Sequence, residues 1–467
     1  MNKFLKTLWF IIFLGTVFIV LHFINAPSTS PPPPARESIT VIEEVPITFD
    51  LEDKTYSEFV EQGDAFFDSG DYANAIKNYL NATELDSKEH DLLIKLGQAY
   101  LLDNQIPKAK LEFEKALRLD PDSVEAKLSL AQANLNLRNT DEAKEIVWAL
   151  DEENSKVKYY RGIIFVLAKE FDKAHAVFSQ VGDEKSKKFV ESFELFSHFR
   201  EADPLYLNML LAKNLTEVGQ YDVAIPFLFD ILNQKNNYRD AWIVLGYAYL
   251  KTGKSEEAID ALNQAKVFAP RHPQVLFYLG LAHFAQNKID SAISYIEAAD
   301  RAGYMPRDHL KLRLGDLYLS KKDYQGASDN YKAVVNLNPD SLGVFVRIVW
   351  INIDELNDSD EAVRFAERAF EHHPESAMSY NLMGWAHAAV GNYDSAEGYF
   401  REALSMREKF DAVYLNLGWM YERMGKYDLA KEYYKEAYLL GQGNSIGNRA
   451  AMRFNELVAH IDSLKSD

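Results

Sequence analysis

A repeat of about 34 residues, running from Tyr56 almost to the C-terminus, constrains the fold of this chain more than any other feature. Most of its marker alanines are 34 or 35 residues apart, with one step of 31 and one of 50. These alanines are Ala75, Ala109, Ala143, Ala174, Ala224, Ala258, Ala292, Ala327, Ala362, Ala396 and Ala430. A period of this length is typical of solenoids, in which each repeat buries its apolar face on its neighbours.

Each repeat also indicates a pair of closely packed helices. A glycine lies twelve residues before most of the alanines, at Gly63, Gly97, Gly162, Gly246, Gly280, Gly315, Gly384 and Gly418. Small residues at both places let two antiparallel helices approach closely. Apolar residues recur at spacings of three and four, which predicts amphipathic helices independently of any family.

These patterns resemble the tetratricopeptide repeat (TPR) family over about residues 56–442. One repeat places residues on the family's signature positions at Trp242, Leu245, Gly246, Tyr249, Ala258, Ala265 and Pro270. The last full repeat does the same at Tyr414, Gly418, Tyr421, Ala430, Tyr434 and Ala437. The resemblance implies an all-α, right-handed superhelical solenoid of about eleven TPR helix pairs.

Departures from the pattern suggest the domain boundaries. We expect one block of about four repeats over 55–182 and a second of about seven over 205–442. Residues 183–204 form an insertion with phenylalanines at helical spacing, at Phe189, Phe193, Phe196 and Phe199, which predicts an additional amphipathic helix. Residues 443–467 predict a helix that caps the last repeat. The repeat near 343–376 has Trp350 in or beside the place of the signature glycine.

The N-terminus predicts a membrane segment. Residues 8–24 form seventeen consecutive residues without a formal charge, about 25 Å of helix and near the lower limit for spanning a bilayer. Lys3 and Lys6 precede them, and Arg36 is the first basic residue afterwards. The positive-inside rule therefore predicts a single-pass protein with a cytoplasmic N-terminus and extracytoplasmic repeats.

The resulting domain plan has a transmembrane signal-anchor at 1–25 and a proline-rich linker at 26–54. The linker contains four successive prolines, which favour an extended spacer. Cleavage of the first segment as a signal peptide is the alternative, although Ile24 and Pro27 do not suit a cut after Ala26.

Composition argues against several functions. Fifty-one basic against seventy acidic residues give a formal net charge of −19, which disfavours nucleic acid as a partner. The absence of cysteine excludes disulfides and thiolate metal sites. No HExxH, GxSxG or P-loop pattern occurs, and adjacent His372 and His373 point in different directions on a helix. We expect no enzyme activity, no catalytic residue, no metal and no cofactor.

The resemblance implies a protein-binding groove along the first helix of each pair, at the fifth and ninth positions of the repeat. The candidate partner-binding residues there are Ile243, Tyr247, Phe277, Leu281, Leu312, Trp385, Leu415 and Trp419. Buried aromatics supply much of the binding energy in such grooves. The same aromatics could instead pack within the solenoid or against another copy.

We therefore expect a membrane-anchored TPR scaffold or adaptor that binds partner proteins through its concave groove. By analogy with the family, it would help to assemble or hold an envelope complex of the secretion, pilus, motility or envelope biogenesis type. The alternative is an architectural subunit that packs or polymerises within a large membrane-associated machine without binding free peptides. Homo-oligomerisation is compatible with both readings.

Overall fold

A computed structural model describes residues 55–68, 70–86, 88–198, 204–441 and 444–466. Every regular element in these ranges is a helix, which confirms the predicted all-α class. The predicted anchor at 1–25 and the predicted linker at 26–54 lie outside the described residues. Within the ranges given above, no helix is both long and apolar enough to span a bilayer.

The helices follow one another with short connections. In the first part they are α2 (Tyr56–Asp68), α3 (Tyr72–Leu85), α4 (His90–Leu102), α5 (Ile106–Leu119), α6 (Val124–Asn136), α7 (Thr140–Trp148), α8 (Ser155–Leu167), α9 (Phe171–Phe178) and α10 (Glu184–His198). They continue with α11 (Pro204–Glu217), α12 (Tyr221–Gln234), α13 (Arg239–Lys251), α14 (Ser255–Phe268), α15 (Pro273–Ala285) and α16 (Ile289–Arg301). The remainder are α17 (Arg307–Ser320), α18 (Tyr324–Leu337), α19 (Leu342–Trp350), the π-helix η1 (Ile351–Glu355), α20 (Ser359–His372), α21 (Ala377–Ala389), α22 (Tyr393–Met406), α23 (Asp411–Arg423), α24 (Tyr427–Leu440) and α25 (Ser445–Ser466).

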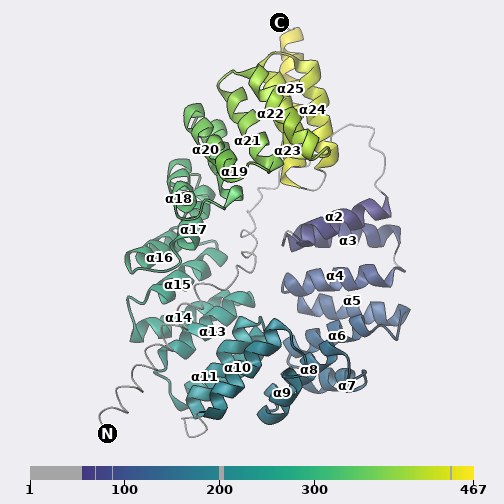
Figure 1. The fold of residues 1–467 in the computed structure, drawn as a ribbon, viewed down its shortest axis with the longest axis vertical. Helices are drawn as coiled ribbons and strands as arrows, with labels where there is room; N and C mark the ends of the chain where they lie inside the picture. Colours follow the sequence, from purple (N-terminus) through teal and green to yellow (C-terminus); the bar gives the residue numbers. More distant parts are fainter. Residues whose placement is uncertain (1–54, 69, 87, 199–203, 442–443, 467) are drawn as a thin grey trace. The chain divides into compact units, whose positions relative to one another are not determined.

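Consecutive helices pair into hairpins, as Figure 1 shows. Helices α2–α9 form four hairpins and α11–α24 form seven, eleven in all among the described residues. Helix α10 stands between the two sets, and α25 follows the last hairpin. The period of about 34 residues in the sequence therefore corresponds to one hairpin.

The signature glycines face a large side chain of the second helix of the same hairpin. A Cβ atom added at Gly384 would lie 2.6 Å from Cδ1 of Phe400, and one at Gly418 would lie 2.5 Å from Cδ1 of Tyr434. Both distances are shorter than any normal carbon contact. The glycine therefore makes room for the ring that fills the centre of the hairpin.

The turn inside each hairpin needs a left-handed backbone conformation. Gly391 has a φ of +84°, but Asn104 and Lys322 adopt φ values of +59° and +61° at the same place in their own hairpins. Glycine enters this region freely, asparagine with little penalty, and lysine at a steric cost. The hairpins thus tolerate different residues at the turn at different energetic cost.

The chain divides into two compact units, Leu51–Ala302 and Gly303–Asp467, which we call the N-terminal and C-terminal units. Helix α10 belongs to the N-terminal unit and packs along α9. Phe189 is fully buried, and its ring stacks on Phe178 at a centroid distance of 4.5 Å and an angle of 2°. Phe199 of the predicted insertion lies outside the described residues.

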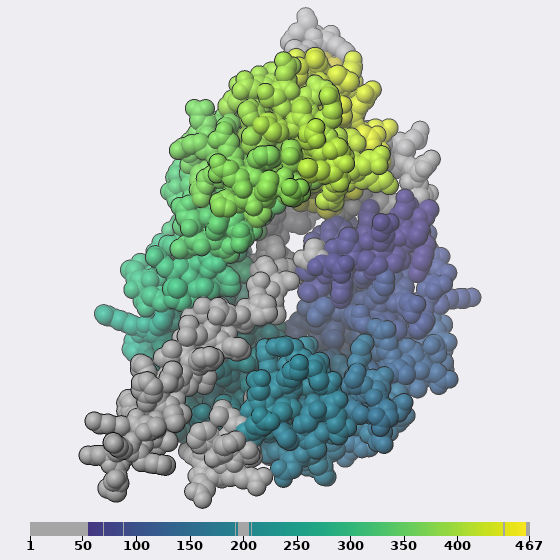
Figure 2. Space-filling model, in the orientation of Figure 1, coloured from purple at the N-terminus to yellow at the C-terminus, as the bar shows by residue number. Residues whose placement is uncertain are grey.

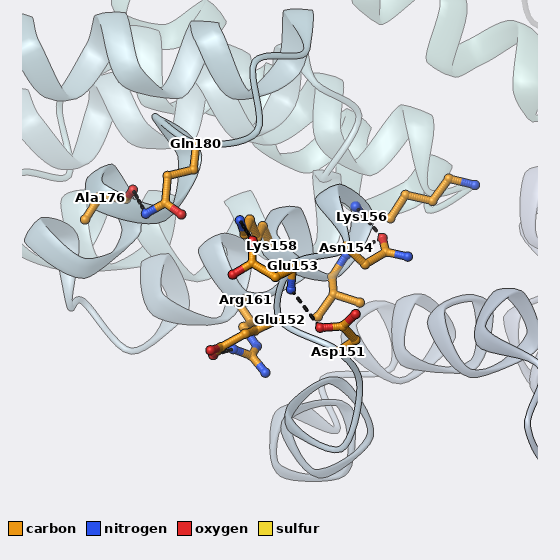
Figure 3. Close-up of polar contacts among 10 residues, drawn as sticks. Asp151, Glu152, Glu153, Asn154, Lys156, Lys158, Arg161, Ala176 and Gln180 are labelled. Carbon is orange, nitrogen blue, oxygen red and sulfur yellow. Dashed lines mark hydrogen bonds and ion pairs between the residues drawn. The ribbon is translucent and has the colours of Figure 1, made fainter.

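Polar contacts fix the loop that leads into α8 (Figure 3). Asn154 caps the helix, because its Oδ1 accepts hydrogen bonds from the backbone N–H of Lys156 at 2.9 Å and of Val157 at 3.4 Å. Two ion pairs of 3.0 Å, Lys158 with Glu153 and Arg161 with Glu152, join the loop to the first two turns. This connection between hairpins is held without a proline.

The C-terminal unit has one core that runs through its successive hairpins. Its fully buried rings include Tyr331, Phe345, Phe400 and Tyr434. Within this unit each hairpin contacts the next one in the sequence, and Figure 2 shows these hairpins as contiguous green to yellow bands on the face in view. Helix α25 closes this core with the buried side chains of Ala450 and Leu457.

The repeat that lost its signature glycine has an irregular first helix. Helix α19 ends at Trp350 and continues as the π-helix η1 over Ile351–Glu355. A π-helix adds residues to a helical turn and changes the direction of the side chains around it; such insertions are frequent at functional sites. The missing glycine therefore coincides with a local change of helical geometry.

Candidate functional site

Four of the candidate groove residues lie in the N-terminal unit, where they pack against other side chains. Ile243 and Phe277 are buried. Tyr247 stacks on Tyr278 at a centroid distance of 5.0 Å, and its ring meets the ring of Tyr221 edge-on at 6.1 Å. Leu281 is half-buried. In this unit the predicted groove residues therefore pack against other side chains of the protein.

The other four lie in the C-terminal unit, and three of them line a cavity. Trp385, Leu415 and Trp419 face a space of about 130 Å³ between α19, η1, α21, α23 and α25, which we call the indole cavity. Its remaining walls are Val346, Trp350, Asp354, Met378, Asn381, Leu382, Ala412, Asn416, Ile446, Arg449 and Arg453. Leu312, on α17, is half-buried outside it.

A cluster of charged and polar side chains links α17 and α19. Arg347 on α19 forms an ion pair with Asp316 on α17, and the Tyr331 hydroxyl donates to Asp316 at 2.9 Å. Burial, followed by the negative charge of Asp316, raises the pKa of the Tyr331 hydroxyl. Arg347 and Asp316, at a fifth and a ninth repeat position, therefore pair with each other. Neither residue lines the indole cavity.

Three indole rings form the apolar walls of the indole cavity. Trp385 and Trp419 meet edge to face, with centroids 6.5 Å apart and planes at 86°. The Arg449 guanidinium lies 5.1 Å from the ring centroid of Trp350. The Arg423 guanidinium lies 4.8 Å from that of Trp419. These cation–π contacts fix two of the rings at the edge of the cavity.

Two asparagines supply buried polar groups. Asn416 Nδ2 donates to Asn381 Oδ1 at 3.0 Å, and Asn381 Nδ2 contacts the sulfur of Met378 at 3.7 Å. Both asparagines are buried. The pair links α21 to α23 and fixes the spacing of the helices that carry Trp385 and Trp419.

Trp385 carries a buried donor that finds no acceptor among the described residues. Its side chain is 7% exposed, and its Nε1 is buried without a hydrogen bond. By contrast, Nε1 of Trp242 donates to the carbonyl oxygen of Asn236 at 2.7 Å. A buried N–H without a partner costs about 1–3 kcal/mol, so the Trp385 indole is a local site of lost stability.

The charged groups at the cavity carry a positive excess. Arg449 pairs with Asp354 at 3.3 Å, whereas Arg453 contacts only the exposed Glu456, at 3.9 Å, among the ion pairs of the described residues. Burial raises the pKa of the Asp354 carboxyl, and the two arginines oppose this shift. Two arginines and one aspartate thus line the cavity of a chain whose net charge is −19.

Sequence reasoning missed several of these residues. Trp350 was noticed only as a departure from the glycine pattern, and its place in the cavity depends on α19 and η1. Arg449 and Arg453 lie on α25, which was expected only to cap the array. Their spacing of four residues places both on one helix face and was an available signal.

The arrangement suits binding of an apolar group. Among the described residues, no histidine lines the cavity. Across the described ranges, no group of three or more histidine, aspartate or glutamate side chains is placed to hold a metal ion.

Family models match repeat after repeat of the chain. Models described as TPR or tetratricopeptide repeat match residues 63–104, 103–164, 209–341, 355–409 and 412–440. The chain belongs to the tetratricopeptide repeat family. Tetratricopeptide repeats generally bind protein partners. The matches leave out α10 and α25, the two helices outside the hairpins, and also α9 and α19.

Relatives of this TPR protein share only part of their length with it. It is 24% identical over 281 residues to the BBSome complex member BBS4 of Bos taurus, covering 58% of this chain and 49% of that protein. It is 22% identical over 182 residues to the cell division cycle protein 16 homolog of Homo sapiens, covering 37% and 29%. The TPR protein thus spans about half, or less, of the length of these relatives.

Solved TPR structures superpose only loosely on the whole chain. The APC/C hetero-tetramer Cut9–Hcn1 matches with 13% identity over 86% of this chain and 96% of that chain, at a TM-score of 0.33. Yeast Tom70 matches with 16% identity over 88% and 97%, at a TM-score of 0.32.

Proposed function

We propose that this TPR protein is a membrane-anchored, extracytoplasmic adaptor that holds partner proteins and helps to assemble an envelope complex. The observation that carries the proposal is the indole cavity in the C-terminal unit, where Trp385, Leu415 and Trp419 leave a space of about 130 Å³. Aromatic anchors around a desolvated pocket are typical of the centres of protein interfaces.

The membrane part of the proposal rests on the sequence. The uncharged residues 8–24 follow Lys3 and Lys6 and precede the acidic stretch that contains Glu43 and Glu44. Retention of this segment would hold the array at the outer side of the membrane, with the proline-rich residues 26–54 as spacer.

On this proposal the partners are proteins, and binding them involves no catalysis. The net charge of −19 disfavours the phosphate backbone of nucleic acid. Envelope machines of the secretion, pilus, motility or biogenesis type are the proposed setting, by analogy with anchored members of the family. Homo-oligomers remain compatible with adaptor function.

The test is site-specific crosslinking in intact cells. A photo-crosslinking amino acid replaces Trp419 in the full chain, and a control carries it at the exposed Arg401 on α22. Membranes are solubilised, the tagged protein is purified and its adducts are identified by mass spectrometry. Adducts with other proteins at position 419 but not at 401 support the adaptor. Adducts only between copies of this chain would overturn it in favour of an architectural subunit.

A further inference from the structure

We propose that the N-terminal unit contains a conformational switch, in which hairpin turns far apart in the sequence hold one another and separate when salt screens their charges. The contacts join Asn104 and Lys169, at the turns of α4–α5 and α8–α9, to Thr252, at the turn of α13–α14, and Asp230, on α12. We call these four residues the turn clasp. Its release lets the two groups of hairpins move apart, which changes the curvature of the unit. This inference does not depend on the adaptor proposal.

The contacts of the turn clasp cross the array instead of following it. Each repeat of a solenoid normally contacts only its neighbours. Asn104 Nδ2, however, donates to the carbonyl oxygen of Thr252 at 2.5 Å, four hairpins further along the chain. Helix α6 contacts α12, two hairpins further along, and Lys169 Nζ lies 2.8 Å from Oδ2 of Asp230, beyond α10 in the sequence. The N-terminal unit therefore folds back on itself.

The side chains that reach across come from one position of the hairpin turn. Asn104, Arg138 and Lys169 hold this left-handed position in three successive hairpins, with φ values of +59°, +64° and +58°. Glycine holds it at Gly219 and Gly253 and has no side chain to extend. A Cβ atom added at Gly253 would lie 2.9 Å from Asn104 Nδ2, so two of the turns meet at their tips. Arginine and lysine adopt this conformation at a steric cost, and such strain is concentrated at functional sites and switch regions.

The turn clasp is sensitive to salt because charged groups hold it. The side chains of Lys169 and Asp230 are 58% and 41% exposed, and salt screens an exposed ion pair. Nearby on α12, Asp222 pairs with Lys254 at 3.5 Å. Burial raises the pKa of the Asp222 carboxyl, while Lys254 and Arg138 lower it, so the turn of α6–α7 also brings a positive charge to α12. Salt weakens these attractions, whereas the apolar core of each hairpin does not depend on them.

The first experiment tests whether the turns meet in solution. The chain contains no cysteine, so introduced thiols are free of background. Asn104→Cys with Gly253→Cys should form a disulfide on mild oxidation of the purified full chain, because Cγ of Asn104 lies 3.9 Å from a Cβ at position 253. Asn104→Cys with Gly219→Cys is the matched control, since a Cβ at that turn meets no atom within 4 Å. Equal disulfide formation in the two pairs, or none in either, would overturn the clasp.

The second experiment measures opening. Spin labels are attached through Leu102→Cys, at a 52% exposed side chain on α4, and Glu256→Cys, at an exposed side chain in the first turn of α14. Double electron–electron resonance then gives the distribution of distances between the two turns. Raising sodium chloride from about 0.1 M to about 1 M shortens the Debye length from about 10 Å to about 3 Å. We expect a component at longer distance to appear or grow over this range while the helical circular dichroism stays unchanged.

Variants of the clasp should shift the same distribution at low salt. Lys169→Glu should raise the open fraction about threefold to tenfold, and the added change Asp230→Lys should restore the closed distance by exchanging the charges. Asn104→Gly removes the hydrogen bond without straining the turn and should raise the open fraction by a similar factor. Lys322→Glu and Asn287→Gly change the same turn position in other hairpins, where the side chain forms no hydrogen bond or ion pair among the described residues. Both controls should leave the distances unchanged.

An identical distance distribution at low and high salt would overturn the inference without any variant. Failure of the charge exchange to restore the closed distance, in a protein with normal helical circular dichroism, would overturn it as well. Neither result touches the adaptor proposal, because crosslinking at position 419 tests the C-terminal unit separately.

Discussion

The Trp385 and Trp419 rings of successive hairpins meet edge to face, with centroids 6.5 Å apart and planes at 86°. The two residues lie 34 positions apart and hold the same place in successive repeats. Stacking of the hairpins therefore turns one sequence position into a continuous aromatic wall. Trp385 is buried in this wall and Trp419 is half-buried at its edge, so they are expected to respond differently to substitution.

Trp385→Ala should lower the free energy of unfolding of the C-terminal unit by about 3–5 kcal/mol, because it removes a large buried ring and enlarges a cavity. Trp148→Ala, at a side chain that is 37% exposed, should cost much less. Urea unfolding followed by circular dichroism measures both changes. Equal losses for the two variants would contradict the burial of Trp385.

Gly384→Ala should destabilise the protein by about 1–3 kcal/mol, because the added Cβ would lie 2.6 Å from the ring of Phe400. Gly398→Ala is the matched control, since a Cβ at that exposed helical position meets no atom within 4 Å. That change should stabilise by about 0.5–1 kcal/mol through helix propensity. Opposite shifts of the urea midpoint are the expected result, and shifts of the same sign would contradict it.

Gly391→Ala should destabilise by about 1–2 kcal/mol even though a Cβ there has open space, because its φ is +84°. Lys322→Gly should stabilise by about 1 kcal/mol for the same reason, since Lys322 has a φ of +61°. Thermal unfolding of each variant beside the unmodified protein measures both. Stabilisation by Gly391→Ala would show that the turn does not require the left-handed conformation.

The Asp354 carboxyl should lower the stability of the folded protein as the pH rises. Burial, with a small contribution from Glu355, raises the pKa of its carboxyl, while Arg449, Arg453 and the Trp350 side chain lower it; the net shift is upward. A raised pKa in the folded state means that the folded protein binds the proton more tightly than the unfolded chain does. This contribution to stability is therefore present at low pH and is lost as the pH rises through the folded-state pKa.

Asp354→Asn removes this titration. The stability of the unmodified protein relative to that variant should increase as the pH falls from 7 toward 4, because the cost of burying the charge disappears. Urea midpoints of both proteins, measured in parallel at each pH, give the difference, and the other titrating groups cancel. A difference that falls with decreasing pH would mean that the Arg449 ion pair outweighs burial.

The membrane proposal predicts that a charge within residues 8–24 prevents insertion of this segment into the membrane. Val17→Arg places a charge near the middle of residues 8–24, at a cost of about 2.5–3.5 kcal/mol for insertion. The full chain should then pass from the carbonate-resistant membrane fraction into the soluble fraction. Ile39→Arg, the same charge in the proposed linker, should stay with the membrane. Membrane retention of the Val17→Arg protein would count against a transmembrane segment.

Much of the fold followed from local sequence. Gly384 and Ala396 lie twelve residues apart, like the equivalent pairs in other repeats, and this spacing predicted hairpins of two close helices. The helices α21 and α22 form that hairpin. Periodicity is sufficient for such a prediction because each hairpin is stabilised mainly by contacts within itself and with its immediate neighbours.

The candidate site was predictable only in part. Trp385, Leu415 and Trp419 occupy equivalent positions in their repeats, and the structure brings them to one cavity. Tyr247 was chosen by the same rule, yet its ring stacks on Tyr278 in the N-terminal unit. Position in the repeat specifies the face on which a side chain lies, but it does not specify which neighbouring side chains fill the space in front of it.

The sequence by itself determined the helical hairpins, their number and the close approach at each signature glycine, because these depend on residues within one or two repeats. The tertiary structure decided where a cavity remains. It placed Trp350, at the end of α19, in the wall of the same cavity as Trp385, and it brought Arg449 and Arg453 of α25 to the same space. A cavity depends on packing among several hairpins, and small changes of helix direction, such as that at Ile351–Glu355, decide whether side chains close it.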